Sequence, residues 1–281
     1  MSLLLNARFA DTVARLSQLS RANPHGLPEV AFVGRSNAGK SSCINALCNQ
    51  KRLAFSSRTP GRTQALNLFA LGPVNQPDPV GFLVDTPGYG FATASLEAKR
   101  SWQALAGDYI TKRQPLVGVA LMIDIRRGLT ELDRQLLAWT PSVLPLILVL
   151  TKADKLSRQQ GIQVRHQIAR DALIREREGP VLLQLFSALN RVGIEALREA
   201  IGDLLSDGAH VWDRLPQKHP GPAAPLLLKT LGAGDAGAAG DATPSTAASS
   251  STSAAASRAS GSTMDDPAAA TAQPPAQALG R

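Results

Sequence analysis

The stretch from Glu29 to Ser42 constrains the fold of this chain more than any other part of the sequence. It contains the pattern Gly-x-x-x-x-Gly-Lys-Ser at residues 34–41, after an apolar run and before apolar residues at helical spacing. Glycines at these positions let backbone N–H groups converge on a polyphosphate, above the positive N-terminus of the next helix. The pattern predicts a P-loop in which Lys40 reaches the β- and γ-phosphates and Ser41 binds Mg²⁺. The alternative, a glycine turn that binds nothing, is disfavoured because the strand and helix context both match.

Strands and helices are predicted to alternate from residue 29 to about residue 208. The strands are expected at residues 29–33, 65–71, 80–84, 116–123, 146–150 and 181–186. The helices are expected at about residues 40–49, around 102–110, and at 130–140, 157–178 and 194–205. Near-continuous apolar strands indicate a mostly parallel, six-stranded α/β sheet with helices on both faces and one antiparallel edge strand from the hairpin at 65–84.

The two ends of the chain differ from this central region. Residues 1–28 form an N-terminal extension, in which Phe9, Val13 and Leu16 have helical spacing and predict a short packed helix. Residues 217–281 are dominated by Ala, Gly, Ser, Thr and Pro and predict a disordered, low-complexity tail. Within that tail, residues 218–231 are either a short docking motif or, as composition favours, a passive extension.

The charge is distributed unevenly. The chain has 30 Lys and Arg residues against 22 Asp and Glu residues, but residues 217–281 contain four of each sign. The net charge of +8 therefore lies entirely in residues 1–216. A basic surface attracts polyanions, and RNA is the obvious one; the alternative is a solubilising surface without a partner. The basic pairs Lys99-Arg100, Lys112-Arg113 and Arg126-Arg127 are candidates for a patch that faces RNA.

Composition also bears on the compartment. At 44% hydrophobic residues the chain can bury a sizeable core. No apolar run reaches the roughly 18 residues of a membrane span, and the start Met1–Leu5 lacks the features of a signal peptide. Cys43 and Cys48 fit no metal pattern and are typical of core residues in a reducing compartment. We expect a cytoplasmic monomer without a membrane span.

A second phosphate motif follows the strand at 80–84. Asp85-Thr86-Pro87-Gly88 places a carboxylate at the end of a buried strand, where it can support Mg²⁺ through a water. The Gly88 N–H can contact a γ-phosphate and move when that phosphate leaves, which is the behaviour of a switch II segment.

The third motif selects the base. Thr151-Lys152-Ala153-Asp154 follows the strand at 146–150, and a carboxylate there can accept two hydrogen bonds from guanine that adenine cannot supply. The aliphatic stem of Lys152 can lie over the base. Ser187-Ala188, after the last strand, fits a loop whose backbone N–H meets the guanine O6. This combination predicts GTP rather than ATP, although a P-loop ATPase or kinase remains an alternative.

A candidate switch I lies between residues 58 and 64, which read Arg-Thr-Pro-Gly-Arg-Thr-Gln. A mobile loop with a threonine at this place can complete the Mg²⁺ coordination when the γ-phosphate is present. Thr63 is the favoured ligand and Thr59 is the competing one. Arg58 and Arg62 are candidates for arginine fingers in cis, although such loop arginines more often contact solvent or RNA.

The order of these motifs closely resembles the EngB family of bacterial ribosome-biogenesis GTPases. The resemblance covers about residues 5–208 and rests on residues 34–42, 59–64, 85–90, 124–133 and 151–156. It implies a Ras-like P-loop GTPase fold, Mg²⁺-dependent GTP binding and hydrolysis, and a role in large-ribosomal-subunit assembly on which normal cell division and septation depend. The implied partners are large-subunit precursors or ribosomal RNA. A nucleotide-gated scaffold for division proteins, with incidental hydrolysis, is the alternative function.

The motifs and the resemblance together define the predicted site. Its catalytic residues are Lys40, Thr63 and Gly88, and its Mg²⁺ ligands are Ser41 and Thr63. The residues predicted to bind the GTP or GDP ligand are Gly34, Arg35, Ser36, Asn37, Ala38, Gly39, Lys40, Ser41, Gly61, Arg62, Thr63, Gln64, Ala65, Asp85, Thr86, Pro87, Gly88, Thr151, Lys152, Ala153, Asp154, Lys155, Phe186, Ser187 and Ala188.

Two positions bear on the hydrolysis rate. Ras-like enzymes have a water-orienting Gln directly after Asp-x-x-Gly, whereas this chain has Tyr89. We therefore expect slow intrinsic hydrolysis that a partner accelerates. Asn37 leaves two interpretations open: it helps to hold K⁺ against the phosphates, or it only stabilises the loop by local hydrogen bonds.

Overall fold

The computed structural model describes residues 3–55, 65–73, 78–90, 100–207 and 226–227. Within these residues, eight strands form one mixed sheet in the order β1-β3-β4-β2-β5-β6-β7-β8. The strands are β1 (Arg8–Val13), β2 (Glu29–Gly34), β3 (Leu66–Leu71), β4 (Gly81–Asp85), β5 (Leu116–Asp124), β6 (Leu146–Thr151), β7 (Val181–Leu185) and β8 (Leu226–Leu227). The strands β4, β2, β5, β6 and β7 run parallel, and antiparallel pairs join β1 to β3, β3 to β4 and β7 to β8.

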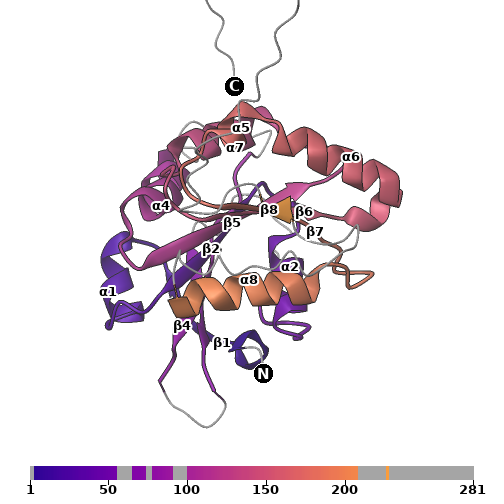
Figure 1. Cartoon of the computed structure of the whole chain (residues 1–281). Coiled ribbons are helices and arrows are strands. Elements are labelled where there is room, and N and C mark those ends of the chain that lie inside the picture. The colour runs from indigo at the N-terminus through magenta and orange to yellow at the C-terminus, as the bar shows by residue number, and fades with distance from the viewer. Residues whose placement is uncertain (1–2, 56–64, 74–77, 91–99, 208–225, 228–281) are drawn as a thin grey trace, which may run out of the picture. The chain divides into compact units, whose positions relative to one another are not determined.

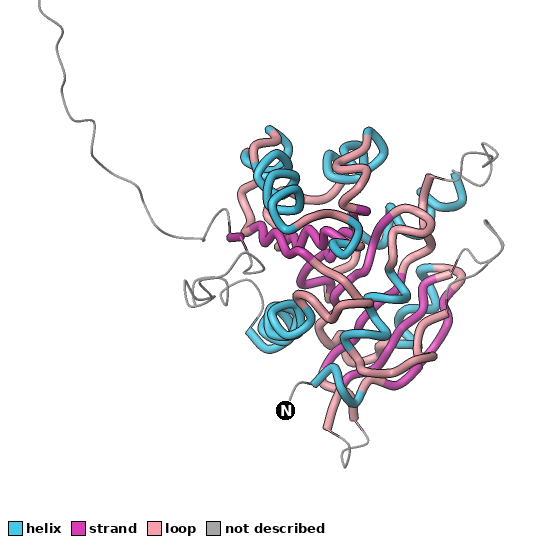
Figure 2. The backbone as a smooth tube through the Cα atoms, turned by 90° about the vertical axis from the view of Figure 1, so that its right-hand side faces the viewer, coloured by secondary structure: helices cyan, strands magenta, loops and turns pink. Residues whose placement is uncertain are grey.

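Helices cover both faces of this sheet. They are α1 (Leu19–Ala22), α2 (Lys40–Leu47), α4 (Asp108–Lys112), α5 (Glu131–Trp139), α6 (Arg158–Ala169), α7 (Ala172–Arg175) and α8 (Ile194–Asp207). Short turns of other helix types are η1 (Leu3–Asn6), η2 (Leu16–Gln18), η3 (Gln103–Gly107) and η4 (Ala153–Lys155). The helices α2 and α8 lie on one side of the sheet and α4 to α7 on the other, as the two views show (Figures 1 and 2).

Alternating side chains of each strand explain this layering, because successive residues of a strand point to opposite faces. In β2, Val30 and Phe32 pack in the cluster that contains α2 and α8. Their neighbours Ala31 and Val33 pack in the cluster that contains α4, α5 and α6. Every residue of β2 is buried, as expected for a central parallel strand.

A buried ionic network ties the start of β2 to its surroundings. The Glu29 side chain is fully buried and accepts hydrogen bonds from Arg113 Nη2 at 2.6 Å, Tyr109 Oη at 2.7 Å and Asn23 Nδ2 at 2.7 Å. The Arg113 guanidinium therefore forms a structural ion pair with Glu29. The prediction that Arg113 belongs to a basic patch that faces RNA is wrong, because this group is turned to the buried carboxylate.

The predicted fold class is confirmed, but the strand count is wrong. All six predicted strands are present, and β1 and β8 add two that the sequence did not indicate. Residues 8–13, predicted as helix, form β1 because their backbone pairs with β3 and Phe9 meets the Phe69 ring edge-on at 6.2 Å. Because β1 pairs with β3, β3 is not the antiparallel edge strand that was predicted from the hairpin at 65–84.

Two further boundaries differ from prediction. The helix expected to reach residue 178 ends at Ala169, because Asp171 caps a new helix, α7, by accepting a hydrogen bond from the Leu173 N–H. Leu226 and Leu227 lie in the segment predicted to be disordered, yet they pair with Leu183 and Leu182 of β7. The rest of the predicted tail lies outside the described residues.

Candidate nucleotide-binding site

The P-loop connects β2 to α2 and is shaped by its glycines. A Cβ atom on Gly34 would lie 2.8 Å from the Met122 carbonyl oxygen, so β2 can pack against β5 here only without a side chain. Gly39 precedes α2 with a φ of +99°, a left-handed conformation that favours glycine. Asn37 also has a positive φ of 62°, which asparagine tolerates better than most residues. The positive φ is one local reason for an asparagine at this place, and both interpretations of Asn37 stay predictions.

Lys40 and Asp85 form the charged centre of the site. Lys40 Nζ donates a 3.2 Å hydrogen bond to the Gly34 carbonyl, which holds the ammonium across the loop. Burial lowers the pKa of Lys40, although the nearby Asp85 carboxylate opposes that shift. Burial also raises the pKa of Asp85 to about 6, partly offset by Lys40.

Asp85 has an unused acceptor. Its Oδ1 atom is buried and has no hydrogen-bond partner among the described residues. The next residue, Thr86, anchors the strand end by donating both its N–H and its hydroxyl to the Phe32 carbonyl, at 3.1 and 2.9 Å. A buried carboxylate oxygen without a partner, at the end of β4 beside the P-loop lysine, suits a hydrated divalent cation. The predicted Mg²⁺ ligand Ser41 lies in the first turn of α2.

Gly88 and Tyr89 lie directly on the P-loop. A Cβ atom on Gly88 would be 3.0 Å from both Lys40 Nζ and the Ser36 amide nitrogen. The Ser36 N–H donates to the Tyr89 carbonyl at 2.9 Å, and the Tyr89 N–H donates to the Gly34 carbonyl at 3.4 Å. The backbone after Asp85, predicted to be switch II, therefore lies directly against the P-loop and its lysine.

The Tyr89 side chain is directed into the core. Its hydroxyl donates to Asp133 Oδ1 at 2.6 Å, and its ring meets that of Trp102 edge-on at 5.5 Å. Trp102 Nε1 in turn donates to the Pro87 carbonyl at 2.7 Å. Burial, with the neighbouring Asp133 carboxylate, raises the pKa of Tyr89 far above its usual value. The phenol therefore stays protonated and does not face the P-loop lysine.

The predicted base-binding residues converge at the ends of β6 and β7. Asp154 Oδ1 accepts a 2.7 Å hydrogen bond from Ser187 Oγ, and this bond is the main reason that the pKa of Asp154 is lowered. Lys155 Nζ lies 3.3 Å from Asp154 Oδ2. The Phe186 carbonyl accepts from the Ala153 N–H at 3.0 Å, and Ala188 is exposed in the following loop. The carboxylate is thus ionised and held in place before any ligand arrives.

Thr151 and Lys152 join this base-binding region to the P-loop. The buried Thr151 hydroxyl lies 2.7 Å from the Ala38 carbonyl and 3.1 Å from the Ile123 carbonyl, so it braces the loop. Lys152 Nζ donates to the Asn37 carbonyl and to Asp124 Oδ2, both at 2.9 Å. The lysine stem therefore spans from β6 to the P-loop, along the side where the base is predicted to lie.

Sequence reasoning gave no role to Asp124, at the end of β5. Arg126 donates to both of its carboxylate oxygens, Nε at 2.9 Å and Nη2 at 2.6 Å, while Lys152 shares Oδ2. These contacts hold the pKa of Asp124 well below its usual range. The available signal in the sequence was an acidic residue directly after a buried apolar strand, two residues before Arg126.

Some of the predicted site residues lie outside the residues that the structure describes. Gly61, Arg62, Thr63 and Gln64, together with Arg58 and Thr59, lie outside the described residues. The predictions for switch I therefore stay predictions. Ala65, the last residue of that set, is buried immediately before β3.

Comparison with known proteins agrees with this geometry. The profile of a family described as 50S ribosome-binding GTPase matches residues 29–152. The chain is 46% identical over 236 residues to a probable GTP-binding protein EngB of Cupriavidus taiwanensis, covering 82% of this chain and 95% of that protein. It is 50% identical over 211 residues to the corresponding Ralstonia pickettii protein, covering 73% and 89%.

A solved structure agrees at the level of the fold. A variant of Era from Aquifex aeolicus, bound to GDP and AlF4⁻, superposes with a TM-score of 0.50 at 22% identity. The match covers 65% of this chain and 58% of that one.

The sheet, the P-loop and the carboxylate at the end of β6 define a P-loop GTPase. Within that class, the chain belongs to the EngB family of GTP-binding proteins. None of the helices in the described part of the chain is long and apolar enough to cross a membrane.

Proposed function

We propose that this GTPase binds GTP with Mg²⁺ and hydrolyses it slowly, as a cytoplasmic and monomeric switch in large-ribosomal-subunit assembly. Normal cell division and septation would depend on that assembly. The observation that supports the proposal is that Gly88 lies close to Lys40 and Ser36. A γ-phosphate held by Lys40 would then reach Gly88, and its loss would free this segment to move. The family description 50S ribosome-binding GTPase supports the ribosomal partner.

The roles of the site residues follow from their chemistry. Lys40 would stabilise negative charge on the transferring phosphoryl group, and Ser41 with Thr63 would hold Mg²⁺, which would neutralise phosphate charge. Asp85 would support the ion through a water, and Asp154 would pair with guanine. The domain organisation that accompanies these roles is a G domain at 29–208, an N-terminal extension at 1–28 and a tail at 217–281.

A slow intrinsic rate follows from the environment of Tyr89. Its hydroxyl is engaged by Asp133, so the side chain after Gly88 cannot orient a water. The ribosomal partner supplies the missing orientation or charge. K⁺ held near Asn37 is a further source of positive charge, and equal rates in KCl and NaCl would exclude it.

Co-sedimentation with ribosomal subunits tests the switch. We expect the chain to bind the large subunit or its precursors with a non-hydrolysable GTP analogue and to be released with GDP. Turnover should rise when those precursors are added. Binding that is equal in both nucleotides, or turnover that is fast and unchanged, would contradict the proposal.

Two alternatives have their own discriminating measurements. A nucleotide-gated scaffold for division proteins predicts a division defect before immature large subunits accumulate on depletion, whereas an assembly factor predicts the reverse order. An ATPase or kinase predicts that ATP competes as well as GTP. Replacing Asp154 by Ala should cost at least about 2 kcal/mol of GTP binding and leave the weak binding of ATP unchanged.

A further inference from the structure

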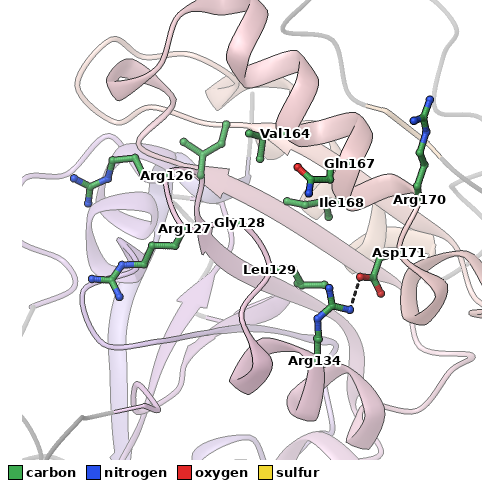
Figure 3. Close-up of a pocket in the computed structure, with 11 residues that line it drawn as sticks. Arg126, Arg127, Gly128, Leu129, Arg134, Val164, Gln167, Ile168, Arg170 and Asp171 are labelled. Atoms are coloured by element: carbon green, nitrogen blue, oxygen red, sulfur yellow. Dashed lines mark ion pairs between the residues drawn. The ribbon is translucent and has the colours of Figure 1, made fainter.

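A second pocket, of about 400 Å³, lies between the loop after β5 and the C-terminal half of α6 (Figure 3). Four arginines line it, Arg126, Arg127, Arg134 and Arg170, against a single acidic residue, Asp171. Its volume falls within the range of pockets that hold small organic ligands. None of these five residues belongs to the predicted nucleotide site.

The arginines differ in how far they are engaged. Arg134 forms an ion pair with Asp171, and Arg126 forms one with Asp124. Arg127 and Arg170 are exposed, and their side chains have no hydrogen bond or ion pair within the described part of the chain. A guanidinium without a carboxylate partner is well suited to bind phosphate through paired N–H groups.

The two available arginines lie at opposite ends of the pocket. Arg126 and Arg127 extend from one end and Arg170 from the other, with the Arg134–Asp171 pair on the side of Arg170 (Figure 3). A nucleic-acid strand that crosses the pocket would therefore have a phosphate next to an arginine at each end of the pocket. Separated charge of this kind suits a polymer better than a single phosphate ion.

Apolar side chains also line the pocket, between its charged groups. Leu129 and Val164 are half-buried and offer a surface for a flat ring, and Gln167 presents an amide that can both donate and accept. Proteins commonly bind unpaired RNA bases with such a combination of side chains. The flat face of the base packs on the apolar groups, and the edge of the base forms hydrogen bonds with the polar group.

We propose that this pocket binds an unpaired nucleotide of RNA, with Arg127 and Arg170 on the flanking phosphates. This proposal rests on the proposed function in one respect: a ribosome assembly factor encounters ribosomal RNA. The face between α5 and α6 would then bind single-stranded RNA with little dependence on its base sequence.

Fluorescence anisotropy with a labelled single-stranded oligouridine, on the full chain with GDP and Mg²⁺, tests the arginines. Arg127→Ala/Arg170→Ala should weaken binding about tenfold and reduce the salt slope by about 1.4, since each single-strand phosphate contact contributes roughly 0.7. Arg52→Ala/Arg175→Ala removes the same charge at exposed positions outside the pocket and should change the affinity less than about twofold. Equal losses in the two double variants would overturn the proposal.

A variant without a charge change tests the base. Gln167→Ala should weaken the oligouridine severalfold and leave inorganic polyphosphate binding unchanged. Oligonucleotides with photoreactive 4-thiouridine should cross-link to residues 125–129 or 164–171. Cross-links elsewhere, or polyphosphate that displaces the oligouridine equally well per phosphate, would overturn the nucleotide assignment; an acidic protein partner would then be favoured.

The pocket and the ribosomal function can fail separately. If the oligouridine results contradict the pocket while the chain still co-sediments with large subunits in a nucleotide-dependent way, only the pocket is wrong. If the chain binds oligouridine through the pocket and never co-sediments, only the ribosomal function is wrong.

Discussion

Tyr89 Oη donates a 2.6 Å hydrogen bond to Asp133 Oδ1, linking the residue after Gly88 to the first turn of α5. Asp133 Oδ2 also caps this helix through the Thr130 N–H at 2.8 Å. One carboxylate therefore fixes both the start of α5 and the end of the predicted switch II segment. The geometry explains why a tyrosine can stand where a water-orienting glutamine is found in Ras-like enzymes.

Tyr89→Phe should destabilise the protein by about 1–3 kcal/mol, because Asp133 Oδ1 would stay buried without its donor. Unassisted GTP hydrolysis should change less than about twofold, since the phenol does not orient the attacking water. Urea unfolding and single-turnover kinetics measure the two effects. A Tyr89→Phe variant whose unassisted rate changes much more than twofold would contradict the view that the phenol takes no part in hydrolysis.

Arg113→Ala should destabilise the protein by about 3–5 kcal/mol, because it leaves the fully buried Glu29 carboxylate without its cation. Lys112→Ala is the adjacent control, in which an exposed pair with Asp108 is lost at a cost of about 0–1 kcal/mol. Chemical denaturation of both variants gives the comparison. Similar losses of stability in the two variants would show that the hydrogen bonds from Tyr109 and Asn23 are enough to stabilise the buried Glu29 carboxylate.

The pH dependence of stability should carry the signature of Asp85. Its pKa is raised from 3.8 to about 6 on folding, so the folded protein keeps a proton that the unfolded chain has lost. Stability of the nucleotide-free protein should therefore fall by about 3 kcal/mol as the pH rises from about 4 to about 6. Asp85→Asn should remove this component and weaken Mg²⁺-dependent GTP binding. Denaturant unfolding curves recorded in EDTA at about pH 4 and about pH 6 measure this loss of stability. If the stability of Asp85→Asn changed with pH as much as that of the wild type, the prediction would be contradicted.

Gly88→Ala should weaken binding of a non-hydrolysable GTP analogue by about tenfold, or about 1.4 kcal/mol, and spare GDP. The added methyl would lie 3.0 Å from Lys40 Nζ and the Ser36 nitrogen, so switch II must move away from the P-loop. Gly202→Ala in α8 is the control, since nothing lies within 4 Å and helix propensity favours the change. Fluorescent-nucleotide titrations measure both; an equal loss for GDP would mean that the P-loop itself is distorted.

Local patterns predicted the central region well. The Gly-rich loop and the apolar strands are set by nearby residues, and the structure has them where the sequence indicated. The convergence of Asp154 with Ser187 was also predictable, because the carboxyl ends of neighbouring parallel strands meet at one edge.

Non-local contacts account for the errors. Nothing in the spacing of residues 8–13 shows that β3 offers a free edge, so helical periodicity was the wrong guide there. The shared use of Asp124 by Arg126 and Lys152 likewise depends on a strand register that the sequence does not display.

The outermost strands also have a consequence for the behaviour of the chain in a crowded solution. β1 carries a bulge between Phe9 and Asp11, and β8 has only two residues. Short or irregular borders of this kind are poor templates for a strand from another molecule, which is the usual first step of fibre formation. Both come from segments outside residues 29–207, so trimming either end should make the protein more prone to aggregate before it alters nucleotide chemistry.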